Sequence, residues 1–262
     1  MLDSFLAGIF TSQWLVVVIV GAILLAASEF GFRIGLRLHR AKDESRKGSI
    51  AGTLGAVLGL LGLLLGFTFA MAAARYESRR SLVLQEANAI GTTYLRAAFL
   101  PPPHQADVEQ LLRRYVDARL DFYESGNDAA RQGEAERVSA EIQRQLWAHA
   151  VASGLEKPTP MVSLFVAALN EVIDLDSMRL NALVAHVPGA VWLLVLAVAS
   201  CGCWASGYQA GANGARSALT HVLLPLLIAV VITLVADLDR PRGGVIGISQ
   251  QPLVDLRRSL GA

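Results

Sequence analysis

The chain has 262 residues, of which 53% are hydrophobic and only 17% are charged. This composition is typical of a membrane protein and unusual for a water-soluble domain. The formal net charge is +1 at pH 7, which argues against an extended nucleic-acid-binding surface as the main function. The lipid bilayer is therefore the first partner that the sequence predicts, and no nucleic acid is expected.

Four apolar stretches are each long enough to cross a hydrocarbon core about 30 Å thick, which takes about 20 helical residues. The first lies between Asp3 and Glu29. It has neither a basic start nor a clear cleavage site, which favours a membrane anchor over a removed signal peptide. The other three predicted spans are Ser49 to Ala74, Pro188 to Ser206 and Ser217 to Ala236.

The region between the second and third spans carries most of the charged residues, and its apolar residues recur with a helical period. No helix breaker occurs between the second span and Pro101, so one long helix is predicted to run from span into domain. Three more helices follow, and a short amphipathic helix is expected from Pro252 to Leu260. The predicted fold is all-α, with a first transmembrane pair (1–74), a helical extramembrane domain (75–182), a second transmembrane pair (183–236) and a tail packed on that domain (237–262).

Glycines in the second span follow alternating spacings of three and four, which places them on one helix face: Gly52, Gly55, Gly59, Gly62 and Gly66. A smooth face of this kind lets another helix approach closely. Two interpretations remain open. The spacing alone favours tight packing against another span of the same chain, and the alternative is packing around the symmetry axis of an oligomer.

Beside the glycines, residues four apart form a ridge that runs from the membrane interior to its surface: Gly59, Leu63, Phe67, Met71, Arg75 and Arg79. Several copies of this ridge around an axis would form an apolar neck from Gly59 to Met71. Arg75 and Arg79 would then line the mouth of the pore. In a single copy the ridge would instead face lipid or be buried.

Two other polar groups have simpler interpretations. Asn170, Asp174, Ser177 and Asn181 share one face of the fourth domain helix, and a solvated face is predicted there. Asp237 and Asp239 close the last span and could hold a cation. Because Arg240 and Arg242 are adjacent, an ion-pair cluster with Arg75, Arg79 or Arg80 is favoured instead, and no metal site is predicted.

The motifs of common enzymes and cofactor-binding proteins are absent from the sequence. It contains no G-x-S-x-G, no H-E-x-x-H, no P-loop and no dinucleotide fingerprint, so neither an enzyme nor a cofactor is expected. Cys201 and Cys203 are two residues apart, where helical side chains point to different sides and cannot form a disulfide within one subunit.

Short motifs occur in a fixed order along most of the chain: Leu61–Phe69, Arg75–Arg80, Glu86–Thr92, Tyr94–Arg96, Asp239–Pro241 and Ser249–Pro252. In this order they resemble the bacterial bestrophin-like domain family, and more distantly the bestrophin ion channels. The resemblance implies a four-span protomer with a cytoplasmic helical domain, a homopentamer, and a hydrophobic neck on the second span. Carried onto this sequence, the neck falls at Leu63 and Phe67, with Gly59 where a bulky residue is usual.

We therefore expect an oligomeric ion channel of the bacterial inner membrane that passes small inorganic anions. The alternative is a non-conducting membrane protein that serves as a scaffold or recruits a partner. Lys and Arg are almost equally frequent on the two sides of the membrane, so their count does not fix the orientation. The resemblance places the helical domain and both termini in the cytoplasm.

Overall fold

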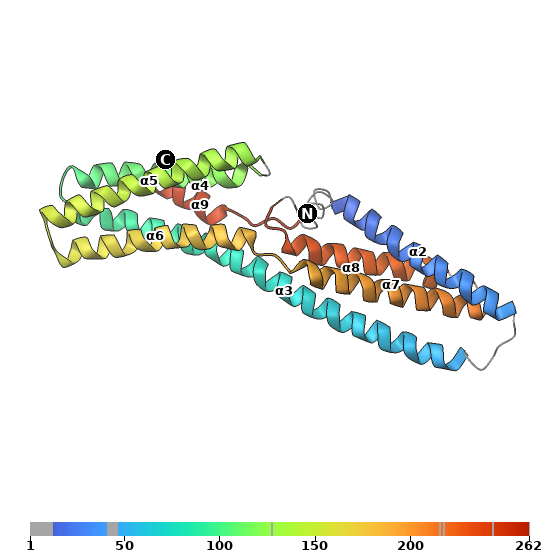
Figure 1. Cartoon of the computed structure of the whole chain (residues 1–262). Helices are drawn as coiled ribbons and strands as arrows, with labels where there is room; N and C mark the ends of the chain where they lie inside the picture. Colours follow the sequence, from blue (N-terminus) through green and yellow to red (C-terminus); the bar gives the residue numbers. More distant parts are fainter. Residues whose placement is uncertain are drawn as a thin grey trace. The chain divides into compact units, whose positions relative to one another are not determined.

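A computed structural model describes residues 13–40, 47–126, 128–214, 216, 218–242 and 244–261. Within these ranges the chain is helical and forms no strand (Figure 1). The start of the first predicted span, before residue 13, lies outside them. The helices are α2 (Gln13–Arg40), α3 (Lys47–Arg96), α4 (His104–Glu124), α5 (Ala129–Glu156), α6 (Pro160–Val184), α7 (Gly189–Ala212), α8 (Leu224–Asp239) and α9 (Gln251–Ser259), with a 3-10 turn η1 (Ala97–Phe99) and a π-helical turn η2 (Leu219–Leu223).

The described residues form two compact units. The membrane unit consists of those within 1–74, 186–240 and 244–246, and it contains α2, the first part of α3, α7 and α8. The helical domain consists of those within 75–185, 241–243 and 247–262, and it contains the rest of α3 together with α4, α5, α6 and α9.

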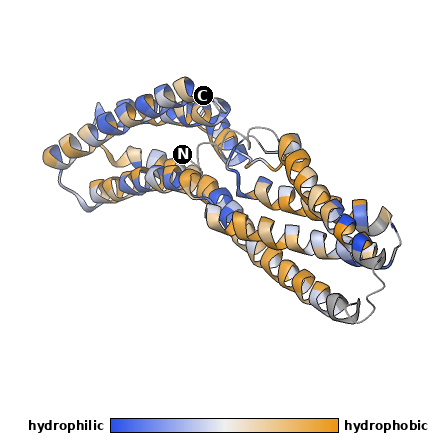
Figure 2. Ribbon diagram, turned by 45° about the vertical axis from the view of Figure 1, so that its right-hand side comes forward, coloured by the Kyte–Doolittle hydropathy of each residue, from blue (hydrophilic) through white to orange (hydrophobic). Residues whose placement is uncertain are grey.

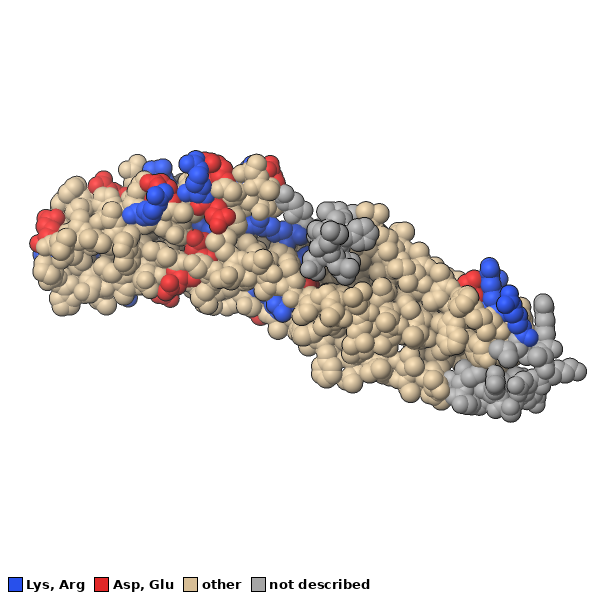
Figure 3. Space-filling model, viewed as in Figure 1, with Lys and Arg blue, Asp and Glu red and all other residues tan. Residues whose placement is uncertain are grey.

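Four helical segments are long and apolar enough to cross a membrane, and each overlaps one predicted span: Trp14–Arg37, Gly52–Phe99, Pro160–Ala212 and His221–Asp239. Hydrophobic residues dominate the helices of the membrane unit, whereas hydrophilic and hydrophobic residues alternate in the helical domain (Figure 2). On the face drawn in Figure 3, charged side chains gather on the helical domain, and most of the surface of the membrane unit carries none. The four-span, all-α prediction is confirmed.

The long helix predicted from span into domain is confirmed as α3, which has no break between Lys47 and Arg96. It is followed by the turn η1, after which Leu100 adopts an extended backbone. Leu100 precedes Pro101, and the proline ring disfavours a helical conformation for the residue before it. The proline run therefore ends the helix, as the sequence predicted.

Side-chain caps define the starts of α5 and α6. The Asp128 carboxylate accepts hydrogen bonds from the backbone N–H groups of Ala130 and Arg131 at 3.0 and 3.1 Å, as a helix N-cap does. The Thr159 hydroxyl accepts from Val162 N–H at 3.3 Å. These caps satisfy donors that have no partner within the helix itself.

The core of the helical domain draws on all of its helices, including the tail. Ile90 of α3, Leu112 of α4, Leu146 of α5 and Phe165 of α6 are fully buried in it. Leu253 of α9 is fully buried in the same core, so burial of apolar surface holds the tail on this domain. The predicted solvated face of α6 is confirmed, because its members are exposed: Asn170, Asp174, Ser177 and Asn181.

In the membrane unit, α2 and α7 pack with their backbones in contact. A Cβ atom added to Gly31 or Gly35 would come within 3.0 Å of the carbonyl oxygen of Trp204 or Tyr208, and real Cβ atoms do not approach so closely. Gly207 and Gly211 meet α2 in the same way. Glycine is therefore required on both sides of this contact.

Candidate functional site

The ridge on α3 lies on the side of the helix that faces away from the rest of the membrane unit. Leu63 and Phe67 are 56% and 61% exposed, and Met71 is 38% exposed. On the opposite side of the helix, Leu61 and Thr68 are buried. The residues predicted to form the neck therefore make one apolar surface that no other described part of the membrane unit covers.

The glycine face of α3 is also uncovered. Among the described residues, no atom lies within 4 Å of a Cβ built on any of its glycines: Gly52, Gly55, Gly59, Gly62 and Gly66. Within the described part of the chain, the structure therefore shows no tight packing of these glycines against another span, which the spacing had favoured. Leu58 and Leu61 lie on the packed side of the helix.

Close packing within the chain occurs instead at Gly31, Gly35, Gly207 and Gly211, which the sequence analysis did not single out. The signal was present, because both pairs have the four-residue spacing of a small-residue helix contact. The glycine pattern of α3 is denser, but residues on the other side of that helix, such as Leu58 and Leu61, make its contacts with the rest of the membrane unit.

The two predicted mouth residues occupy different environments. Arg79 is only 4% exposed. Its Nε donates to the Ala182 carbonyl at 2.9 Å and its Nη2 donates to the Ala185 carbonyl at 2.6 Å. These carbonyls close the last turn of α6, where a cation is favourable. Arg79 thus anchors the end of α6, whereas Arg75, one turn earlier on α3, is half-buried.

Asp237 and Asp239, at the end of α8, bind backbone N–H groups within the membrane unit. Both carboxylate oxygens of Asp239 accept from Val187 N–H, at 3.1 and 3.0 Å. Asp237 accepts from Val245 and Ile246 at 3.3 and 3.0 Å. The two carboxylates therefore hold the start of α7 and the chain after α8. Their pairing with Arg75, Arg79 or Arg80 stays a prediction.

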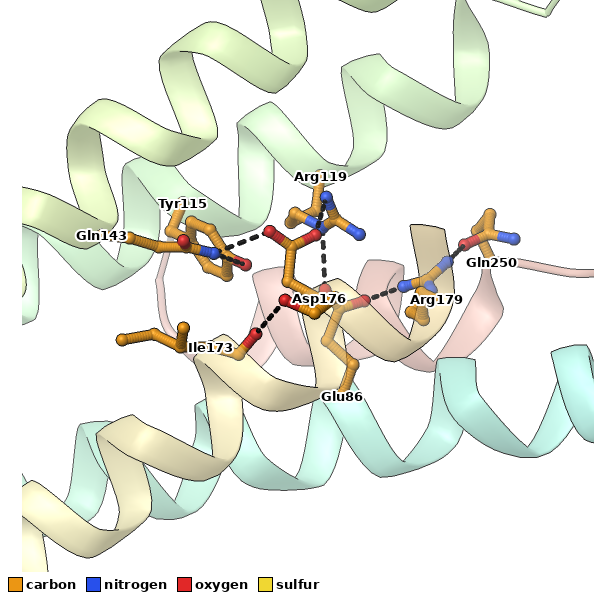
Figure 4. A network of polar contacts seen from close by, with 9 residues as sticks. Glu86, Tyr115, Arg119, Gln143, Ile173, Asp176, Arg179 and Gln250 are labelled. Atoms are coloured by element: carbon orange, nitrogen blue, oxygen red, sulfur yellow. Dashed lines mark hydrogen bonds and ion pairs between the residues drawn. The ribbon is translucent and has the colours of Figure 1, made fainter. Parts of the chain in front are cut away.

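A buried network of charges lies in the helical domain (Figure 4). Arg119 of α4 is fully buried and lies between two carboxylates. Its Nε donates to Glu86 Oε1 of α3 at 2.7 Å, and its Nη1 is 2.5 Å from Asp176 Oδ1 of α6. Arg179, also of α6, pairs with the second oxygen of Glu86.

Polar side chains complete this network and connect it to the tail. Arg179 Nη2 donates to Gln250 Oε1 at 2.8 Å. Gln143 of α5 donates to Asp176 at 2.7 Å and to the Tyr115 hydroxyl at 3.0 Å. One set of ionic and polar contacts therefore joins four helices and the residue before α9. Because the contacts are shared, a shift of one helix would disturb its contacts with the others.

This network was not predicted from the sequence, although the sequence contains a signal for it. Arg119 lies four residues after Tyr115 and three before Phe122, on the apolar stripe that predicted α4. Glu86 lies in the same way between the buried residues Val83 and Ile90. A charged residue at a core position of an amphipathic helix predicts a buried partner of opposite charge.

Burial also changes the titration of two tyrosines beside the network. It raises the pKa of Tyr123 to about 12, although the nearby charge of Arg119 lowers this value. Burial raises the pKa of Tyr115 as well. Both side chains are therefore neutral at physiological pH. Within the described ranges, no group of three or more His, Cys, Asp or Glu side chains is arranged to hold a metal ion.

Comparisons with known proteins agree with this fold. A bacterial bestrophin homolog from Klebsiella pneumoniae is 14% identical, with 95% of this chain and 97% of that chain covered and a TM-score of 0.67. A point variant of a bestrophin homolog from the same organism gives 14% identity, 90% and 96% coverage and a TM-score of 0.66. No curated protein matches the sequence. A family model described as the bestrophin-like domain matches residues 21–253, so the chain belongs to the bestrophin-like domain family.

Proposed function

We propose that several copies of this chain assemble around an axis lined by α3 and form a channel for small anions, rather than an enzyme. One observation carries the proposal: the face of α3 that the described residues leave uncovered combines bare glycines with the ridge of Leu63, Phe67 and Met71. Membership of the bestrophin-like family supports it. By the same resemblance we propose five copies.

The glycines favour a protein partner over lipid on this face. Other outward surfaces of the membrane unit carry large side chains, and Leu193, Leu227 and Val230 are each about half exposed. Lipid tails contact such side chains well, whereas a glycine face gains contacts only when another backbone comes close. A second copy of α3 beside the first would supply that backbone.

The ridge supplies the elements of an ion path. Rings of Leu63 and Phe67 would form an apolar constriction, which conducts when it is hydrated and closes when water leaves it. Arg75 would raise the local concentration of anions at the mouth, and Arg79 would add its positive charge from a buried position. Gly59 and Met71 would extend the neck on either side.

A non-conducting scaffold is the second candidate. Gly59 favours it, because the resemblance to bestrophins places a glycine where a bulky residue is usual, so a neck in this chain would be shorter. In that case the same oligomer would present the helical domain to a partner, and no ion would cross.

Current measurements distinguish the two candidates. Purified protein in planar bilayers under a chloride gradient should conduct, and its reversal potential should lie close to the equilibrium potential of chloride. The double variant Leu63→Ala/Phe67→Ala should give a larger open current, because the constriction widens. Leu193→Ala removes similar bulk from an exposed position of α7 and should leave the current unchanged. If wild type and the double variant are both silent while the oligomer stays intact, the scaffold is the correct function.

We further propose that the protein lies in the bacterial inner membrane with the helical domain and both termini in the cytoplasm. A green-fluorescent fusion at the carboxyl end should be bright, and an alkaline-phosphatase fusion at the same place should be inactive. An active phosphatase fusion together with a dark fluorescent fusion would show that the orientation is the opposite one. Arg75 would then lie at the external mouth of the pore.

A further inference from the structure

The helical domain holds an excess of positive charge beside its buried network. Arg242 stacks on two aromatic rings of α4, with its guanidinium carbon 4.4 Å from the Phe122 centroid and 5.4 Å from that of Tyr123. Arg119 lies 5.4 Å from the same Phe122 centroid, and Arg179 lies 4.1 Å from the Tyr123 centroid. Three guanidinium groups therefore surround two neighbouring rings.

The carboxylates of this cluster do not balance its arginines. Glu86 and Asp176 pair with Arg119 and Arg179. Arg242 donates to the Gly126 carbonyl at 3.4 Å and has no carboxylate partner among the residues that the structure describes. Burial lowers the pKa of Arg242, and the charge of Arg119 lowers it further. Because a guanidinium remains protonated at neutral pH, one positive charge is left uncompensated.

Several N–H donors of the cluster are also unused. Arg119 is fully buried, yet its Nη2 has no hydrogen-bond partner within the described part of the chain. The same holds for Nε and Nη2 of Arg242. A buried charged donor without an acceptor destabilises the fold, and an uncompensated buried charge does so more strongly. An occupant that carries negative charge and accepts hydrogen bonds would correct both deficits.

We propose that the helical domain binds one chloride-sized monovalent anion at the unpartnered N–H groups of Arg119 and Arg242. The occupant must be small, because the unpartnered N–H groups of Arg119 and Arg242 are buried, and it must be monovalent, because one positive charge is uncompensated. Phosphate and nucleotides are too large for a buried position of this kind. The site would stabilise the segment around Arg242 on α4, and it does not depend on whether the chain conducts.

Thermal unfolding of the full chain in detergent tests the site. Chloride is raised from about 5 to about 500 mM while gluconate keeps the ionic strength constant, and the unfolding midpoint should rise by roughly 2 to 5 °C. Bromide should act like chloride, since it has the same charge and nearly the same size. A water molecule at the site predicts no difference between chloride and gluconate, and that result would overturn the proposal.

Single substitutions test whether the chloride dependence of the unfolding midpoint comes from the arginine cluster. Arg242→Gln removes the excess charge and should abolish the chloride dependence. Arg258→Gln is the matched control, because Arg258 is exposed on α9 and its side chain pairs with the exposed Asp255; its chloride dependence should equal that of wild type. Arg75→Gln should also keep the dependence. A loss of dependence in Arg75→Gln but not in Arg242→Gln would place the anion at the proposed pore instead.

A second measurement covers the case in which Arg242→Gln does not fold. Crystals of the wild-type protein grown in sodium bromide should give an anomalous peak within hydrogen-bond distance of Arg119 Nη2 or the Arg242 guanidinium. Density without an anomalous signal at that place identifies water and would refute the anion site.

Discussion

Gly207 of α7 lies against the carbonyl oxygen of Ser28 in α2, at a distance that leaves no space for a Cβ atom. Ser28 is itself fully buried, and its hydroxyl lies 3.0 Å from His221 Nδ1. The backbone of α2 therefore cannot move away from Gly207 without breaking this second contact. The membrane unit depends on glycine at the α2–α7 contact and not on the glycine-rich face of α3.

Gly207→Ala should destabilise the membrane unit. Alanine is the better helix former by about 1 kcal/mol, but the added methyl group clashes with backbone, and overpacking of this kind costs about 1 to 3 kcal/mol or more. We expect less folded protein and a lower unfolding midpoint in detergent. Gly133→Ala is the control, because a Cβ at Gly133 of α5 meets no described atom. Equal midpoints for the two variants would contradict the tight contact.

The sequence predicted the fold well because its signals were local. The proline run after Leu100 and the cap at Asp128 act on their immediate neighbours, and the helical period of apolar residues needs no partner to be recognised. Which helix packs against which other helix is not a local property. Glycine spacing shows that a close contact is possible, but it does not say with which helix, and that depends on side chains elsewhere in the chain.

The candidate site was predictable only in part for the same reason. The ridge of Leu63 and Phe67 follows from positions on one helix, so it could be derived before the structure was known. Arg79 lies on the same ridge by spacing, yet the end of α6 lies close enough to bind it. The ionic network around Arg119 brings together residues from four helices, and no local pattern specifies which acid meets which base.

Gly59→Leu and Gly62→Leu should weaken the oligomer without unfolding the protomer. No described residue covers either position, so the added bulk should meet another copy, where overpacking costs on the order of 1 to 3 kcal/mol. Native mass under mild detergent should shift toward smaller species. If both variants keep the wild-type mass, the glycine face does not form the contact between copies. Gly133→Leu, at an uncovered position of α5, should keep the wild-type mass.

Arg119→Met should be among the most destabilising changes in the helical domain. It leaves Glu86 without its partner at 2.7 Å and Asp176 without its partner at 2.5 Å, and removing one member of a buried ion pair costs about 3 to 5 kcal/mol. Thermal unfolding in detergent measures the loss. Arg137→Met removes an exposed arginine that pairs with Glu134 and should change the midpoint little. Similar midpoints for both variants would mean that the network contributes little to stability.

The raised pKa of Tyr123 predicts that the folded chain loses stability in alkaline solution. Its pKa is about 12 in the folded chain and about 10 in an unfolded one. Above about pH 10 the unfolded state loses this proton while the folded state keeps it, so stability falls as the pH rises toward 12. Below about pH 10 this contribution is fully present. Tyr123→Phe should therefore show a shallower fall in unfolding midpoint over that interval, and an unchanged slope would exclude Tyr123 as its source.

Charge reversal should separate the roles of Arg75 and Arg79, which lie one turn apart on α3. Arg75 is half-buried, so Arg75→Glu should fold and shift the selectivity of the proposed channel toward cations. The shift should be larger at low salt, because exposed charges are screened within about 10 Å at 0.1 M. Arg79→Glu places a carboxylate against the carbonyl oxygens of Ala182 and Ala185. It should therefore reduce the amount of folded protein before selectivity can be measured.

Arg80→Glu is the control for both variants. Arg80 follows Arg79 directly and carries the same charge, but it is exposed and its contact with Glu77 is 3.5 Å long, so its reversal should leave folding intact. Reversal potentials in planar bilayers and folded yield in detergent measure the two effects. An unchanged reversal potential in Arg75→Glu, together with a shifted one in Arg80→Glu, would indicate that the side of α3 that carries Arg80 lines the mouth of the pore. A folded and conducting Arg79→Glu would mean that the end of α6 does not need its arginine.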